Sequence, residues 1–431
     1  MSLHALVVVL LVLCLSSGLQ GAVSKSELQT CMSDEIDTKP LFLFFNDTAR
    51  KNFKESTSVL TYRPSQSLQG FGNLIIGTFG MMLLAHVKGD IPLVAHAMVA
   101  AMFNHPLSNE GLTFQKILED PDGTISLPSV SDSGPETFRE NGPNKKTYIN
   151  VLGTGDSLKR DPVRQFYADL LNMSTSDPRL YDVMSSAAAQ WMLNNPSRRF
   201  QSIYEEFKAE KESQCTSGHF DFGIQLRSWV DWLSYYDAFK KNKPCIVDCI
   251  ESVIVNVVTS AARENDVPPC VFFTADSGED ANDIIKSLKR KFSVRSPAVE
   301  VEFVVSARPT LIKGEIDDRE AYKLHGENDK PFAWRSDFVL RSTRDSFNIN
   351  DLSKRTDLLD WMLFGDVDTG IYSGGSTFGR TARMRRGYSA QLNDHIFTTR
   401  AALTQKGCMC VPVQPEDFSN IKYNGLGVMV L

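Results

Sequence analysis

Arg227 is the residue of this sequence best suited to bind an anion. It directly follows an apolar run at 222–226 that is typical of a buried strand, within the segment GIQLR. A guanidinium is costly to bury, so an arginine in this position usually meets a negative charge. The partner is either a phosphate, bound through two parallel hydrogen bonds, or a neighbouring carboxylate such as Asp221 or Asp231. The residues alone leave both alternatives open.

Asp276 and Ser277 form a second candidate, at the end of the apolar run in VFFTADSGED. Either residue can cap the helix predicted to follow, and a capping role alone accounts for both residue types. The alternative role is nucleotide binding, in which a carboxylate or backbone group accepts hydrogen bonds from a ribose or base.

The third candidate lies in GIYSGGSTFGRTARMRRG, residues 370–387. Gly374 and Gly375 permit close approach of the backbone, while Ser376 and Thr377 add hydroxyl groups. The helix predicted to follow offers unpaired N–H groups at its positive end, so the segment can form an anion site. The alternative is an ordinary helix cap at Ser376 followed by a solvent-exposed basic helix.

Two weaker patterns accompany these candidates. Gly70 and Gly72 predict a tight turn before a helix that Asn73 would cap, but QGFGN is not a dinucleotide-binding fingerprint. Asp366 and Asp368 form a D-x-D pair, and two carboxylates at this spacing can hold a divalent ion. Such pairs are common by chance, and a solvated turn is the favoured explanation of this one.

The predicted elements bring the three candidates to one edge. Helices dominate up to about residue 212, with a long loop at 119–145 that is rich in Pro, Gly, Ser and Asp. Beyond residue 215, apolar runs alternate with helical patterns, which favours a parallel α/β sheet of Rossmann type. Such sheets bind ligands at the carboxyl ends of their strands, where Arg227, Asp276 and the segment 373–378 are expected.

Composition and the N-terminus restrict the compartment. The chain has 431 residues, 42% hydrophobic and 23% charged, with a net charge of -6, which does not favour nucleic-acid binding. Residues 3–15 are apolar apart from His4 and are followed by small residues, which predicts a signal peptide or a short anchor over residues 1–22. Sequons at Asn46 and Asn172 agree with entry into the secretory pathway.

The eight cysteines also fit that pathway. Removal of residues 1–22 would take Cys14 and leave seven, so we expect several disulfides and at least one free thiol. CIVDC and CMC are an alternative four-cysteine metal site, although neither has the spacing of a zinc knuckle.

Four segments in order, QGFGN, GIQLR, VFFTAD and YSGGSTFG, resemble the GDP-fucose-dependent fucosyltransferases of the GT-B type. The likeness is greatest to the plant xyloglucan-type members, because related α1,2-, α1,6- and protein O-fucosyltransferases usually have histidine where this chain has Gln225. The resemblance implies two Rossmann-like domains that face a cleft, and transfer of fucose with inversion and without a metal. We therefore expect an N-terminal acceptor-side domain over 23–212 and a C-terminal domain for the nucleotide sugar over 213–431.

The resemblance also implies roles for individual residues. Arg227 would bind the β-phosphate of GDP-fucose and stabilise the departing diphosphate, and Asp276 would lie beside the guanine or ribose. The remaining donor-site residues implied are Gly70, Gly72, Asn73, Gln225, Ser277, Ser373, Ser376, Thr377 and Phe378. Asp231 is a guess for the base that deprotonates the acceptor.

The arginines that follow the segment 373–378 divide by their position along the predicted helix. Arg380, in the first turn, could still face the diphosphate, whereas Arg383, Arg385 and Arg386 are expected to be structural or solvated.

The expected partners are a nucleotide sugar and a glycan or glycoprotein acceptor, with no cofactor, metal or nucleic acid. Membrane association is expected only through the N-terminal segment. The expected location is the secretory pathway, in the Golgi lumen, with secretion as the alternative. Two other functions stay open: a noncatalytic glycan- or nucleotide-binding relative of the same fold, and a metal-dependent glycosyltransferase that uses the D-x-D pair.

Overall fold

A computed structural model of the chain describes the residues from 36 onward, with gaps. The described ranges are 36–56, 58–62, 71–93, 99, 102–110, 138–141, 147–151, 161–177, 179–228, 233–260, 267–295, 299–307, 356–374, 376–397, 410–412, 422–423 and 429–430. The predicted signal or anchor segment therefore lies outside the described residues. Thr38–Leu431 form one compact unit.

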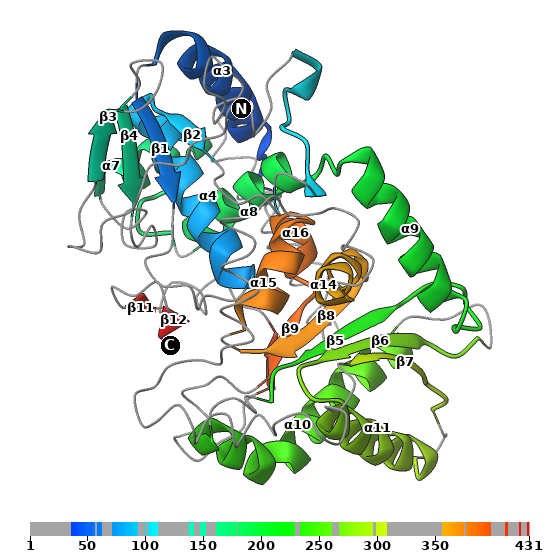
Figure 1. Ribbon diagram of the computed structural model, residues 1–431. Coiled ribbons are helices and arrows are strands. Elements are labelled where there is room, and N and C mark those ends of the chain that lie inside the picture. The colour runs from blue at the N-terminus through cyan, green and yellow to red at the C-terminus, as the bar shows by residue number, and fades with distance from the viewer. Residues whose placement is uncertain are drawn as a thin grey trace, which may run out of the picture. The chain divides into compact units, whose positions relative to one another are not determined.

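A six-stranded sheet forms the centre of the C-terminal half (Figure 1). Its strands are β5 (Phe222–Leu226), β6 (Cys270–Ala275), β7 (Glu302–Ala307), β8 (Thr369–Ser373), β9 (His395–Phe397) and β10 (Cys410–Pro412). They are ordered β10-β9-β8-β5-β6-β7, and every neighbouring pair is parallel except β9 and β10. The predicted parallel α/β sheet is confirmed.

The strand order reverses beside β5. The chain moves outward from β5 to β6 and β7, and then returns to place β8 on the other side of β5. This reversal is a topological switch point, and open α/β sheets bind ligands outside the carboxyl ends of the strands at such a point. The end of β5, where Arg227 follows, is therefore the expected ligand position in this sheet.

Helices cover both faces of this sheet (Figure 1). They are α10 (Leu233–Ser260), α11 (Gly278–Ser293), α14 (Thr356–Asp366), α15 (Thr377–Met384) and α16 (Tyr388–Gln391). On the face toward α10 and α11, the side chains of Phe222, Ile224 and Leu226 join one buried hydrophobic cluster. Alternate residues of the same strand face α14 and α15, so β5 is buried on both sides, as a central parallel strand should be.

The N-terminal half contains a smaller sheet, ordered β2-β1-β4-β3. Its strands are β1 (Ser58–Tyr62), β2 (Ile91–Leu93), β3 (Phe138–Asn141) and β4 (Thr147–Val151), and its helices are α3 (Lys39–Glu55), α4 (Phe71–Lys88), α7 (Asp161–Leu171), α8 (Leu180–Leu193) and α9 (Arg198–Glu212). Three of these strands are parallel, and β3 pairs antiparallel with β4. The short elements η1 (Ser108–Glu110), β11 (Lys422–Tyr423) and β12 (Met429–Val430) complete the described structure.

Two element boundaries differ from the sequence prediction. β3 falls inside the predicted loop at 119–145, because pairing with β4 supplies backbone hydrogen bonds that local composition cannot reveal. The run CIVDCIESVIVNVVTSAA predicts a helix from Cys245, and the observed helix, α10, begins at Leu233 and contains Pro244. Proline is a helix-start signal only on average, and tertiary packing carries this helix through it.

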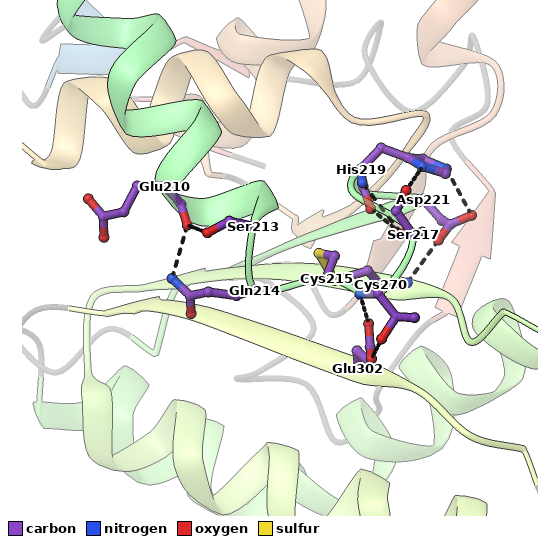
Figure 2. The surroundings of a disulfide bond; sticks show 10 residues. Glu210, Ser213, Gln214, Cys215, Ser217, His219, Asp221, Cys270 and Glu302 are labelled. Atoms are coloured by element: carbon purple, nitrogen blue, oxygen red, sulfur yellow. Dashed lines mark hydrogen bonds and ion pairs between the residues drawn. A yellow bond between two sulfur atoms is a disulfide. The ribbon is translucent and has the colours of Figure 1, made fainter.

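Disulfides tie the C-terminal sheet to its surroundings. Cys215, just after α9, is bonded to Cys270 at the first position of β6, with 5.8 Å between the Cα atoms (Figure 2). Cys249 of α10 is bonded to Cys410 of β10, and Cys245 is also disulfide-bonded. The Cys249–Cys410 bond overturns the alternative of a metal site built from CIVDC and CMC, because oxidised sulfurs are not thiolate ligands. No helix among the described residues is long and apolar enough to cross a membrane.

Candidate functional site

The predicted site residues meet at the carboxyl ends of β8, β5 and β6, which are neighbours in the sheet. The register aligns Gln225 with Tyr372 on one side and Leu226 with Ala275 on the other. Arg227, Ser373 and Asp276 therefore lie at one edge although they are far apart in the sequence. The sequence prediction that these positions share an edge is confirmed as geometry.

Arg227 occupies the switch point. Its backbone N–H donates to Ser373 Oγ at 2.8 Å, which joins the ends of β5 and β8. Its guanidinium Nη1 donates to Asp276 Oδ2 at 2.6 Å, which joins the ends of β5 and β6. The side chain is only 13% exposed. The sequence predicted an anionic partner for Arg227, either a phosphate or a carboxylate such as Asp221 or Asp231. The carboxylate that accepts from its guanidinium is Asp276.

Asp276 is bound through both of its carboxylate oxygens. Oδ2 accepts from Arg227, and Oδ1 accepts from Ser228 twice, from the backbone N–H at 2.8 Å and from the hydroxyl at 2.7 Å. The next residue, Ser277, is the N-cap of α11 and accepts a hydrogen bond from the backbone of Asp280. The cap predicted for this segment is thus confirmed, and it belongs to Ser277.

The segment after β8 turns sharply into α15. Gly374 N–H donates to Phe397 O at 2.9 Å, and Ser376 N–H donates to Ser373 O at 3.0 Å. Ser376 is the N-cap of α15 but makes no side-chain capping hydrogen bond. Because the first N–H groups of a helix have no partners within it, the start of α15 at Thr377 and Phe378 presents donors at this edge.

Gly72 brings the N-terminal half onto the same turn. A Cβ at this glycine would lie 2.5 Å from the backbone carbon of Thr377 and 2.6 Å from the backbone nitrogen of Phe378. Only glycine permits this approach, so α4 and α15 cross in direct backbone contact. The predicted cap at Asn73 is wrong, because α4 already begins at Phe71 and Asn73 lies within its first turn.

Gln225 lies beneath the first turn of α15 rather than at the open edge. It is 5% exposed, and its Oε1 makes no hydrogen bond within the described part of the chain. A Cβ on Gly379 would lie 3.0 Å from this oxygen. The side chain therefore supports the turn that carries Ser376 and Thr377.

Three of the four arginines after the turn are interior residues. Arg380 is 2% exposed and pairs with Asp182 of α8 at 2.8 Å. Arg383 is fully buried, donates to both carboxylate oxygens of Asp394 and also to carbonyl groups at the end of α14. The solvated basic helix considered from the sequence is therefore wrong.

Arg385 is the third interior arginine, and it contacts the first aspartate of the D-x-D pair. It forms an ion pair with Asp366, which also accepts a hydrogen bond from the Tyr204 hydroxyl. Burial alone would raise the pKa of Asp366, but Arg385, Tyr204 and Arg386 outweigh it and lower that pKa. Asp366 thus serves the protein interior, and no cluster of three metal-ligating side chains occurs among the described residues.

Some predicted site residues cannot be placed. Gly70, Gly375 and Asp231 lie outside the described residues, as does the side chain of Asn73. The role of Asp231 as base therefore remains a prediction.

Two contributors escaped the sequence reasoning. Ser228 follows Arg227 directly, yet a serine after a strand gives no signal that it binds a distant aspartate. Asp182 did carry a signal, because it is a lone charge in the apolar helix LYDVMSSAAAQWML and such a charge needs an interior partner.

Comparison with known proteins gives structural likeness alone. No protein-family model and no curated protein sequence matches the chain. Among solved structures, a mutant of Arabidopsis thaliana FUT1 in complex with GDP is similar, with 11% identity, a TM-score of 0.44, and coverage of 84% of this chain and 79% of that one. The NodZ α-1,6-fucosyltransferase soaked with GDP-fucose is similar with 14% identity, a TM-score of 0.36, and coverage of 83% and 99%. The same enzyme co-crystallised with GDP gives 13% identity, a TM-score of 0.35, and coverage of 82% and 98%.

Proposed function

We propose that this chain is an inverting, metal-independent glycosyltransferase that moves fucose from GDP-fucose to a hydroxyl of a glycan or glycoprotein. The observation that carries the proposal is the position of Arg227 at the topological switch point, joined to Ser373 on one side and Asp276 on the other. A guanidinium beside the start of a helix is suited to a diphosphate. The choice of GDP-fucose rests on the resemblance of the four ordered segments.

In this proposal the diphosphate lies across the ends of β5 and β8. Arg227 binds the β-phosphate and stabilises the negative charge that develops as GDP departs. The N–H groups of Thr377 and Phe378 and the hydroxyls of Ser376 and Thr377 bind the phosphates from the α15 side. The acceptor oxygen attacks the anomeric carbon from the opposite face and loses its proton to a base, for which Asp231 is the candidate.

The wider assignments follow from the same proposal. Residues 213–431 form the nucleotide-sugar domain, 23–212 contribute the acceptor side, and 1–22 are a cleaved signal or an anchor. Disulfides are typical of oxidising compartments, which supports a place in the secretory pathway, such as the Golgi lumen. The engagement of Asp366 with Arg385 speaks against the D-x-D mechanism.

A donor screen tests the proposal. GDP-fucose is compared with other sugar nucleotides, scored by release of GDP with and without a mixture of glycan acceptors. We expect GDP-fucose to be preferred, and both R227A and R227K to lose at least the roughly 100-fold in kcat typical of a removed charge-stabilising donor. R386A is the control for loss of a guanidinium, because Arg386 has no role in the proposed site and its side chain is 46% exposed.

The outcomes separate the alternatives. Transfer by R227A at the wild-type rate refutes the mechanism. Binding of GDP-fucose without turnover favours the noncatalytic relative, and loss of activity in a chelator favours a metal-dependent transferase.

A further inference from the structure

The contacts of Asp276 form a short chain that ends on the proposed phosphate-binding arginine. Ser228 is fully buried and donates twice to Asp276 Oδ1, and Asp276 Oδ2 accepts from Arg227 Nη1. The backbone of Asp276 is held as well, because its N–H donates to Leu226 O at 3.4 Å. The carboxylate therefore has a fixed place and a fixed orientation before any ligand arrives.

This arrangement leaves Asp276 poorly suited to contact a nucleotide itself. Both of its oxygens already accept short hydrogen bonds from protein donors, and the side chain is 12% exposed. A carboxylate also repels a diphosphate unless a cation lies between them. What the carboxylate can do is restrict the Arg227 side chain, since a guanidinium held through Nη1 by a fixed carboxylate has fewer orientations open to it.

We propose that Asp276, held by Ser228, is a positioning residue that fixes the Arg227 guanidinium for a nucleoside diphosphate. The inference rests on the proposed function and replaces the role beside guanine or ribose that the resemblance implied for Asp276. The benefit is preorganisation: the rotamer entropy of the long arginine side chain is lost on folding and not on binding.

D276N is the sharpest test of this positioning role, because each described group that contacts the carboxylate donates a hydrogen bond to it. Whichever way the amide of D276N turns, its NH2 group meets either Arg227 Nη1 or the N–H and hydroxyl of Ser228. We expect GDP binding, measured by calorimetry, to weaken and kcat for GDP-fucose to fall by up to roughly 100-fold, the cost of a misplaced catalytic group. D276E, which keeps two acceptor oxygens, should recover part of the loss. S228A, which removes one of the two bonds to Oδ1, should show a smaller loss of both quantities.

Asp221 provides the matched control, because it lies at the amino-terminal end of β5, beside the start of β6 (Figure 2). Its Oδ2 accepts from the backbone N–H of Cys270 at 2.8 Å, so D221N makes the same chemical change on β5 and β6 away from the site. We expect D221N to lower the melting temperature while GDP affinity and kcat stay at wild-type values. A merely structural role for Asp276 would instead make the two variants alike.

The outcomes decide separately on the two proposals. GDP affinity and kcat of D276N equal to those of the wild type overturn the positioning role alone, as does an equal catalytic loss in D221N. If D276N does not fold, S228A carries the same decision. Failure of the wild-type protein to bind GDP overturns the proposed function, and the positioning role falls with it.

Discussion

Asp360 of α14 is an acid that the folded protein should prefer to keep neutral. Its carboxyl contacts two hydroxyls and pairs with no cation among the described residues: Thr274 Oγ1 lies 3.1 Å from Oδ2, and Ser306 Oγ lies 2.5 Å from Oδ1. Burial raises the pKa of Asp360 to about 7, and the two hydroxyl contacts offset this only in part. D360N replaces the acid by a neutral isostere, and its effect on the free energy of unfolding should therefore depend strongly on pH.

The sign and size follow from the pKa difference between the two states. The folded pKa of about 7 lies above the ordinary value of 3.8, so the folded protein binds this proton more tightly. The stability that the proton contributes is complete below pH 3.8 and is lost as the pH rises through 7. A difference of about 3 units corresponds to about 4 kcal/mol of unfolding free energy. D360N should equal the wild type near pH 4 and exceed it by up to about 4 kcal/mol at pH 8.

Urea unfolding of both proteins at pH 4, 6 and 8, followed by circular dichroism, measures this difference. Burial also lowers the pKa of His86 to about 3 and that of His105 to about 4, which weakens the folded state in acid. That effect is common to both proteins and cancels in the comparison. D394N is the control at pH 8, because Asp394 is equally buried but pairs with Arg383, so removal of its charge should destabilise the folded state there.

A difference between D360N and wild type that stays constant from pH 4 to pH 8 would refute the reasoning. So would destabilisation by D360N at pH 8 of the same size as that by D394N.

Two further predictions concern packing and modification. G72A places a methyl group against the backbone of Thr377, so we expect a loss of about 1–3 kcal/mol in thermal unfolding, and an unchanged melting temperature would contradict the close crossing. Asn172 lies in an exposed turn with φ 52°, whereas Asn46 lies in α3 with its Oδ1 accepting from Trp191 at 2.9 Å. Protein secreted from cells should therefore show a glycosidase-sensitive mass shift that N172Q removes and N46Q retains, and the reverse pattern would count against the burial argument.

The sequence predicted correctly the features that depend on interactions between neighbouring residues. The buried character of β5, the cap at Ser277 and the helix that follows it depend on residues close in sequence, and each lies where predicted. Strand pairing, in contrast, depends on residues that are not neighbours in the sequence. β3 was predicted as part of a loop, because its pairing with β4 cannot be read from local composition.

The arginines after β8 make the same distinction more sharply. The sequence offers no local reason to bury Arg380 or Arg383, and each is neutralised by a carboxylate from another element, Asp182 of α8 and Asp394 before β9. Burial of an unpaired charge is energetically costly, so a buried arginine needs a carboxylate partner. The tertiary fold determines which carboxylate lies within reach.

The sequence by itself determined that an arginine, an aspartate and a serine-glycine turn follow buried strands of one parallel sheet. Only the tertiary structure decided that Arg227 and Asp276 bind each other, that Ser228 holds the pair, and that Gly72 packs on the turn at Thr377. The physical reason is that the period of a strand fixes which way a side chain points, whereas strand order and helix crossing fix what it meets.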